Sequence, residues 1–248
     1  MAANDSANAL ILGATSDIAR AAAEALAADG YALQLAARRA DALERERADL
    51  SVRTGRDVAS HVLDILDTAR HAEFIAGLDP VPEVVVCVVG GMGDQAVNQT
   101  DADAAARVIA TNFTAPAQLL GRFANLFEER GHGVIVGVGS VAGDRGRAKN
   151  YVYGSAKAGF AAFLSGLRNR LTGSGVHVAT VKPGYVRTRM TEGLDLPRSL
   201  TATPAQVGEA IWRAVARRRD ETYVLPIWWL VMTIVRAIPE RIFKRLDL

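Results

Sequence analysis

The sequence predicts a three-layer α/β fold, in which a doubly wound parallel sheet is covered by helices on both faces. Short apolar runs alternate along the 248 residues with longer stretches of helical composition, which is the pattern of repeated strand–helix units. The runs contain few polar positions, as expected of parallel strands buried on both faces. Right-handed crossovers between such strands give a doubly wound sheet. With no repeat, linker or change of composition, we expect one domain over residues 1–248.

Strands and helices are expected in alternation from the N-terminus. The predicted strands cover residues 9–13, 32–36, 58–65, 84–89, 134–138, 176–181 and 223–225. The predicted helices cover residues 17–28, 41–53, 67–78, 101–129, 150–171 and 204–218. Thr203 followed by proline favours the start of the last helix, and Pro116 is expected to bend the longest one. Because ligands of such sheets bind beyond the carboxyl ends of the strands, we expect the functional residues there.

The composition excludes several classes of function. The 29 basic and 27 acidic residues give a formal charge of +2, which argues against a nucleic-acid partner. Cys87 is the single cysteine, so no internal disulfide can form, and residues 1–8 lack the charged and apolar regions of a signal peptide. Both observations favour a cytoplasmic location. The four histidines show no metal-ligand spacing, so we predict no metal site.

The turn after the first strand, residues 13–19, has features of a phosphate-binding loop. Gly13 allows a tight turn, and the following helix offers free N–H groups and a partial positive charge. Asp17 and Ala19 stand where further glycines are expected. An ordinary strand-to-helix turn explains this loop equally well.

The end of the second strand indicates which dinucleotide is bound. An NAD site places an acid about 20 residues after the glycines, but no acid occurs between Gly30 and Asp41, where Arg38 and Arg39 stand instead. A guanidinium can hold the 2′-phosphate of NADP(H). Solvated arginines are the alternative, although a cation at a helix start opposes the helix dipole; we favour Arg38 as the ligand. Asp64 could accept a hydrogen bond from the adenine amine or cap the next helix.

The strongest pattern combines Ser140, Tyr153 and Lys157. The tyrosine and lysine are four residues apart on a predicted helix and share a face. A neighbouring ammonium favours a phenolate, so Lys157 is expected to lower the pKa of Tyr153 toward the working range. Tyr153 can then transfer a proton while hydride moves, and Ser140, which follows the fifth strand, can hold the substrate oxygen. Tyr151 has no lysine four residues on. By spacing alone, a surface pair is the alternative.

These motifs resemble those of the short-chain dehydrogenase/reductase family over nearly the whole chain. The matching segments are residues 13–19, Asp64, Gly90, Asn112, and residues 140–143, 153–157 and 183–188. The resemblance implies a Rossmann fold and an NAD(P)-dependent oxidoreductase acting on CH–OH groups, and we expect a homodimer or homotetramer. It implies that the catalytic residues are Asn112, Ser140, Tyr153 and Lys157, with Asn112 bending its helix around a water that links Lys157 to solvent. The expected cofactor contacts are Gly13, Thr15, Ser16, Asp17, Ile18, Arg38, Asp64, Gly90, Tyr153, Lys157, Pro183, Val186 and Thr188.

One segment departs from the family. Residues 87–90 read Cys-Val-Val-Gly where the family has Asn-Asn-Ala-Gly. Hydrogen bonds that brace the sheet are therefore expected to be lost, which leaves the cofactor contact of Gly90 open.

Two features bear on the substrate. Residues 152–155, 186–190 and 238–244 are similar to those of reductase subunits of decaprenylphosphoryl-ribose 2′-epimerases, which implies a ketosugar carried on a polyprenyl phosphate. Arginine clusters near a site suit phosphate, and Arg187 and Arg189 are our candidates for binding an anionic substrate. Further basic residues of this group are Arg145, Arg147, Lys149 and Arg198. A solvated basic rim is the alternative for each.

The C-terminal segment, from about residue 227 to 248, is expected to be an apolar helical extension. Residues 227–238 are nearly all apolar, begin with two tryptophans and precede several basic residues. The run is shorter than the about 20 residues that span a bilayer. It suits peripheral contact with the inner face of the membrane, or docking against the core or a partner subunit.

Three functions are therefore weighed. The first is an NADP(H)-dependent ketone reductase, or the reverse alcohol dehydrogenase, acting on a lipid-linked sugar. The second is a reductase for a small soluble ketone, with the C-terminus serving assembly. The third is a nucleotide-binding sensor or scaffold without turnover, which has no need of the poised phenol of Tyr153.

Overall fold

A computed structural model describes residues 7–193 and 195–246. Residues 1–6, on which the prediction of no signal peptide partly rests, and residues 247–248 of the C-terminal extension lie outside the described part. Seven parallel strands in the order β3-β2-β1-β4-β5-β6-β9 form the central sheet. The strands are β1 Asn8–Leu12, β2 Ala32–Ala37, β3 Val58–Val62, β4 Val84–Cys87, β5 Gly133–Val138, β6 Val176–Lys182 and β9 Glu221–Tyr223.

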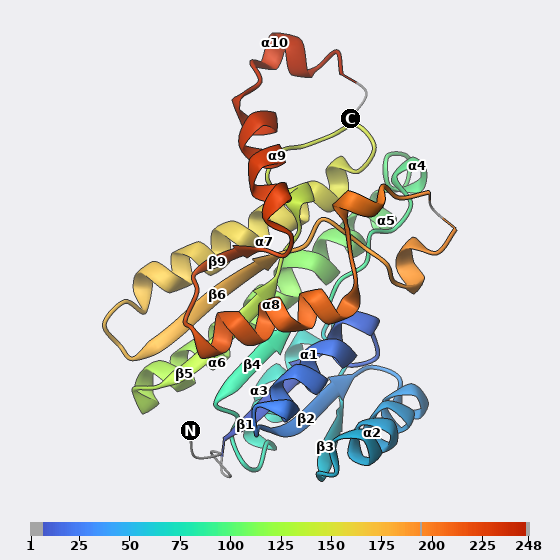
Figure 1. The fold of residues 1–248 in the computed structure, drawn as a ribbon. Helices are drawn as coiled ribbons and strands as arrows, with labels where there is room; N and C mark the ends of the chain where they lie inside the picture. The colour runs from blue at the N-terminus through green and yellow to red at the C-terminus, as the bar shows by residue number, and fades with distance from the viewer. Residues whose placement is uncertain (1–6, 194, 247–248) are drawn as a thin grey trace.

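Helices cover both faces of this sheet (Figure 1). They are α1 Asp17–Ala28, α2 Ala40–Thr54, α3 His71–Ala76, α4 Gln95–Asn98, α5 Ala102–Ile109, α6 Ala115–Arg130, α7 Tyr151–Arg170, α8 Pro204–Ala216, α9 Pro226–Ala237 and α10 Glu240–Phe243. One apolar core lies between the sheet and α1, α2 and α8. A second core lies between the opposite face and α3, α6 and α7. The predicted fold class, a doubly wound parallel sheet, is confirmed.

The sequence of β1 explains how one strand serves both cores. Ala9 and Ile11 belong to the first core, Leu10 and Leu12 to the second, and all four are buried. Successive side chains of a strand point to opposite faces. A strand that is apolar throughout therefore needs helices on both sides of the sheet.

The longest predicted helix, over residues 101–129, is interrupted rather than continuous. α5 ends at Ile109, a π-helical turn covers Ala110–Thr114, and α6 begins at Ala115. The irregularity expected at Pro116 lies instead at this π-helical turn, and Pro116 occupies the first turn of α6, a position that tolerates proline.

Several shorter elements differ from the sequence prediction. The last strand, β9, begins and ends two residues before the predicted 223–225. The Val224 amide still donates to the Lys182 carbonyl at 3.2 Å, and Val224 and Leu225 pack against the first core. α4 was not predicted, nor was a small second sheet of β7 Tyr185–Val186 and β8 Thr201–Ala202. At two to four residues each, these elements are too short to produce a periodic pattern.

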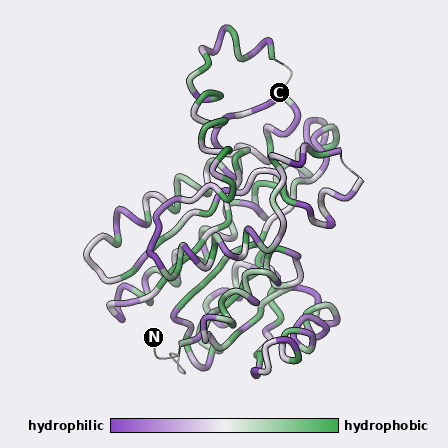
Figure 2. Tube along the Cα trace, viewed as in Figure 1, coloured by the Kyte–Doolittle hydropathy of each residue, from purple (hydrophilic) through white to green (hydrophobic). Residues whose placement is uncertain are grey.

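The C-terminal helices α9 and α10 project from the body of the fold (Figure 1). Hydrophobic residues lie along the strands and again along this extension (Figure 2). Among the described residues, no helix is long and apolar enough to cross a membrane.

Candidate active site

Two adjoining cavities lie at the carboxyl edge of the sheet. The smaller has a volume of about 380 Å³ and follows β1, β2, β3 and β4. The larger has a volume of about 630 Å³ and follows β4, β5 and β6, with one wall from α7. Both are lined by Thr15, Ser16, Val88, Gly90 and Gly91. They therefore form one elongated groove, in the position where open α/β sheets bind ligands.

The loop after β1 can cradle a phosphate. Gly13 has a φ of +84°, and a Cβ on it would lie 3.1 Å from the backbone nitrogen of Val89, so the position requires glycine. Ser16 caps α1 by accepting a hydrogen bond from the amide of Ala19 at 3.2 Å. The larger cavity is lined by Thr15, Ser16, Asp17 and Ile18. The positive end of α1 thus faces the cavity, and these residues fit the pyrophosphate of a dinucleotide.

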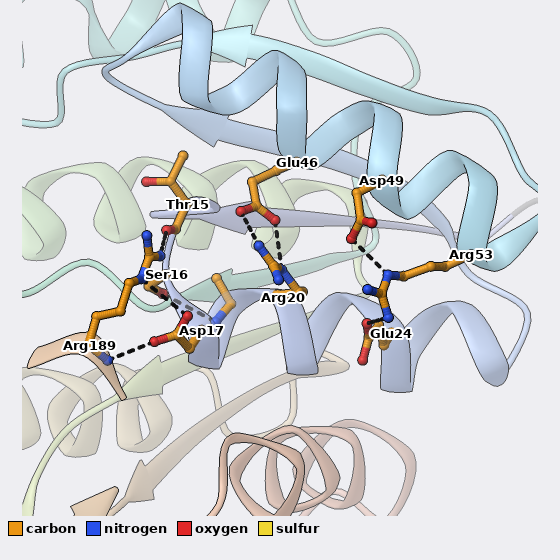
Figure 3. Close-up of polar contacts among 10 residues, drawn as sticks. Thr15, Ser16, Asp17, Arg20, Glu24, Glu46, Asp49, Arg53 and Arg189 are labelled. Carbon is orange, nitrogen blue, oxygen red and sulfur yellow. Dashed lines mark hydrogen bonds and ion pairs between the residues drawn. The ribbon is translucent and has the colours of Figure 1, made fainter. Parts of the chain in front are cut away.

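The acid in this loop has a cation of its own (Figure 3). The carboxylate of Asp17 lies 3.3 Å from Nε of Arg189 and accepts a hydrogen bond from the Arg189 amide at 3.0 Å. The guanidinium also donates to the carbonyl of Thr15 at 2.7 Å. The negative charge beside the phosphate cradle is therefore compensated. Arg189, a candidate for binding substrate, lies against the phosphate loop.

The adenosine end contains the two side chains that follow β2 and β3. Arg38 is exposed and lines the smaller cavity together with Asp64. The carboxylate of Asp64 accepts a hydrogen bond from the Leu66 amide at 3.0 Å, so it stabilises its own turn, while Asp67 precedes the following 3-10 helix. Arg39 lines the larger cavity instead.

The serine turn after β5 rests directly on α7. The hydroxyl of Ser140 accepts a hydrogen bond from the Ala142 amide at 3.1 Å. A Cβ on Gly143 would lie 2.8 Å from a backbone nitrogen of α7, and one on Gly154 would lie 2.9 Å from the carbonyl oxygen of Ala142. These glycines allow the close approach that brings Ser140 to Tyr153, and both side chains line the larger cavity.

Lys157 lies one turn after Tyr153 on α7 and is buried. Its Nζ is 5.8 Å from the centroid of the Tyr153 ring and donates a hydrogen bond to the carbonyl of Val138 at 3.0 Å. The predicted pair therefore shares one face of α7 and points into the groove. Tyr151, by contrast, is exposed and does not line either cavity.

Asn112 joins this group from the π-helical turn. It is fully buried, accepts a hydrogen bond from the Gly91 amide at 3.2 Å and donates to the Gly91 carbonyl at 2.7 Å. A Cβ on Gly90 would lie 2.8 Å from Oδ1 of Asn112 and 3.1 Å from Nζ of Lys157. The two side chains therefore meet at Gly90. The Asn112 amide thus holds Gly91, directly after the segment 87–90 that departs from the family.

Burial is the main cause of the pKa shifts of Lys157, Tyr153 and Cys87. Desolvation lowers the pKa of Lys157 to about 8 and raises the pKa of Tyr153, while a hydrogen bond with Ser140 acts in the opposite direction. Burial also raises the pKa of the Cys87 thiol to about 11, so that group is neutral beneath Lys157. The lowering of the Tyr153 pKa expected from Lys157 is not seen in this structure: burial raises the pKa of Tyr153, and the contribution that opposes it comes from Ser140.

The basic residues predicted on the substrate side occupy different places in the structure, and only some of them line the cavity. Arg187 is exposed and does not line the cavity, whereas Pro183, Val186 and Thr188 do. Arg145 donates to the carbonyls of Val235 and Ile238, each at 2.6 Å, and therefore holds the C-terminal extension. Arg147 and Asn150 line the larger cavity. Asn150 was not predicted from the sequence, because a polar residue before a helix is common and indicates no particular function.

The buried face of α9 packs against residues that line this cavity. The indole of Trp228 packs against Gly184 and donates a hydrogen bond to the carbonyl of Leu200 at 3.0 Å. Its ring also meets that of Tyr185 edge-on, with centroids 5.5 Å apart. The extension is thus joined to the loops that line the substrate side of the groove.

The chain is similar to known proteins along most of its length. Residues 7–198 match the family model described as short chain dehydrogenase. An uncharacterized oxidoreductase of Mycobacterium tuberculosis is 36% identical over 241 residues, covering 96% of both chains. An uncharacterized oxidoreductase of Streptomyces coelicolor is 38% identical over 243 residues, covering 96% of this chain and 94% of that protein. A short-chain dehydrogenase from Sphingobium yanoikuyae, solved in complex with NADPH, has a TM-score of 0.80 and 26% identity, with 96% of each chain covered.

Proposed function

The chain belongs to the short-chain dehydrogenase/reductase family, and on that premise we propose that it is an NADP(H)-dependent ketone reductase, or the corresponding alcohol dehydrogenase. The observation that carries the proposal is the meeting of Asn112, Ser140, Tyr153 and Lys157 in a groove that continues to the phosphate cradle at Gly13.

The four polar side chains provide the proton chemistry. When bound, the cofactor supplies or accepts the hydride. Ser140 holds the carbonyl oxygen by a hydrogen bond, and Tyr153 donates its phenolic proton to that oxygen in the direction of reduction. The ammonium of Lys157 stabilises the phenolate left behind. Asn112 holds the backbone at Gly91 beside Lys157, where a water can connect the lysine to solvent.

NADP(H) is the proposed cofactor because of the charge at the adenosine end. Arg38 lines the smaller cavity directly after β2, and no acid stands there to bind a ribose 2′-hydroxyl. A guanidinium suits a phosphate. The NADPH complex of the Sphingobium relative supports the same choice. The proposed cofactor contacts otherwise stay those predicted from the sequence, all of which line one of the two cavities.

We further propose that the ketone is a sugar carried on a polyprenyl phosphate at the inner face of the membrane. Support comes from the α9 apolar face, which we define as Ile227, Trp229, Leu230 and Ile234, all exposed. Basic residues follow it at Arg236, Arg241, Lys244 and Arg245. An apolar face bordered by tryptophan and cations suits the surface of an anionic bilayer. Assembly as a dimer or tetramer rests on the family resemblance, and light scattering would measure it.

The function is tested by turnover. Consumption of NADPH and of NADH would be followed with a panel of ketones, including sugars and small soluble ketones. We expect turnover with NADPH to exceed that with NADH. Tyr153→Phe should reduce it by about 10²–10⁴-fold without loss of NADPH binding, and Tyr151→Phe, two residues away on the exposed side, should not. NADPH binding without turnover of any ketone would instead favour the sensor hypothesis.

A further inference from the structure

Among the described residues, the arginines that line the larger cavity are Arg39, Arg147 and Arg189. Arg39 precedes α2 at the dinucleotide end, and Arg189 is bound to the phosphate loop. Arg147 comes from the segment between Ser140 and Tyr153 and lies on the substrate side. It is therefore the arginine positioned to meet a substrate rather than the cofactor.

One nitrogen of the Arg147 guanidinium, Nε, is buried and makes no hydrogen bond with the described residues. More than nine in ten buried polar groups in proteins are hydrogen-bonded, and a buried donor left unpaired lowers stability. A charged group in this situation, at the wall of a cavity, is explained if a ligand supplies the missing acceptor.

The backbone around Arg147 is held on both sides. Asp144 accepts hydrogen bonds from Lys182 at 2.8 Å and Tyr223 at 2.7 Å. Arg145 forms hydrogen bonds with the C-terminal extension, and the backbone N–H of Asn150 donates to the backbone carbonyl of Arg147 at 3.1 Å. Arg147 therefore projects from a fixed segment, as a binding residue should.

A second buried polar atom without a partner belongs to the same cavity. Oδ1 of Asn150 is buried without a donor, and Asn150 lines the same cavity. We propose that Arg147 binds a carboxylate or phosphate carried by the ketone substrate, while Asn150 accepts a hydrogen bond from a neighbouring hydroxyl. A guanidinium forms charge-assisted, bidentate hydrogen bonds with either anion. This inference rests on the proposed function, since it assigns a substrate contact within the same site.

The test measures binding to the NADP⁺-bound protein, where no ketone can be reduced. Calorimetry would compare dihydroxyacetone phosphate with dihydroxyacetone, and acetoacetate with methyl acetoacetate. We expect the anionic member of at least one pair to bind about tenfold or more tightly, and the pair identifies the anion. Arg147→Met should abolish this preference with little change for the neutral member, and Arg147→Lys should retain part of it. Arg122→Met, an exposed arginine of α6, is the matched control and should keep it in full.

Two results would overturn the inference. One is the absence of any preference in the unmodified protein, including failure of the anionic members to bind. The other is an Arg147→Met variant, folded by circular dichroism, that keeps the preference. Turnover of the neutral ketones with NADPH is measured separately. If turnover is absent while the preference depends on Arg147, the proposed function fails and the anion site stands. If turnover is present while the preference is absent or does not depend on Arg147, the proposed function stands and the anion site is wrong.

Discussion

At the scale of single residues, the site contains a buried lysine, Lys157, whose surroundings disfavour its charged form. Lys157 is buried, with a pKa lowered to about 8 from an ordinary value of 10.5. In the folded protein the lysine therefore loses its proton before the unfolded chain does. Between these two values the unfolded state binds more protons, so stability rises with pH. Below about pH 8 the buried ammonium costs stability.

The rise of stability with pH should disappear when Lys157 is replaced by methionine. Urea unfolding of both proteins would be measured from about pH 7 to pH 10, so that other titrating groups cancel in the difference. The unmodified protein should gain about 2 kcal/mol of stability relative to the variant over this range. A difference that does not change with pH would contradict the assigned burial of the charge.

Residue types and spacing predicted which side chains come together in the groove, but not the contacts that hold them. Tyr153 and Lys157 are found by their four-residue spacing because a helix fixes which positions share a face. The contact between Asp17 and Arg189 joins residues 172 apart, and no local pattern encodes such a pairing. For the same reason the sequence did not separate Arg145, which holds the C-terminus, from Arg147, which lines the cavity.

At the scale of elements, Arg145 attaches α9 to the active-site region in addition to the packing of Trp228 and Met232. The guanidinium of Arg145 donates to carbonyls at the end of α9 and to Glu240 of α10 at 2.8 Å, and it lies 3.7 Å from the ring centroid of Phe243. Unpaired carbonyls at a helix C-terminus favour a cation there. Arg145 thus connects the serine turn with the C-terminal extension.

Removing this cation should loosen the extension. In Arg145→Met, amide hydrogen exchange over residues 231–243 should accelerate by about tenfold or more, because hydrogen bonds to a charged group contribute about 1.5–3 kcal/mol. Exchange in β1 and β4 should change little, and Arg122→Met should leave both regions as they are. Unchanged protection of α9 would show that Trp228 and Met232 hold it without Arg145.

Periodicity located most of the elements, but not the break at Asn112. Apolar strands and long amphipathic helices repeat often enough to be recognised. A single π-helical turn changes the register by one residue inside a helical composition, so nothing in the spacing reveals it. The Asn112 side chain stabilises the turn region through the Val108 carbonyl at 2.8 Å and Gly91. This tertiary contact supplies the information that local sequence lacks.

At the scale of the whole molecule, one helix links the groove to the α9 apolar face, because α9 packs with its buried side against a loop that lines the larger cavity. The buried side of α9 contacts the loop at Gly184, and its other side exposes Trp229 and Ile234 at 60% and 57%. If the α9 apolar face contacts the bilayer as proposed, a substrate with a lipid tail would reach the groove from that side. This is the basis for proposing a lipid-linked rather than a soluble ketone.

Vesicle sedimentation tests that arrangement. The full chain should bind vesicles containing phosphatidylglycerol more strongly than phosphatidylcholine alone, with weaker binding at high salt. Exchanging Trp229→Ser and Ile234→Ser should reduce binding by about tenfold or more, and these changes leave the buried Trp228 in place. Val52→Ser, which removes an even more exposed apolar residue from α2, should have no effect. Equal binding by all three proteins would contradict membrane contact through α9.

Transfer of the label from NADPH deuterated at the transferable position tests the central claim most directly. The groove that joins Gly13 to Tyr153 predicts that a reduced ketone gains one deuterium at its new alcohol carbon, detected by mass spectrometry of the product. The rate of labelling should fall in Tyr153→Phe and persist in Tyr151→Phe. Tight NADPH binding with no labelled alcohol from any ketone, or labelling at the same rate without the Tyr153 hydroxyl, would contradict the assignment of this site.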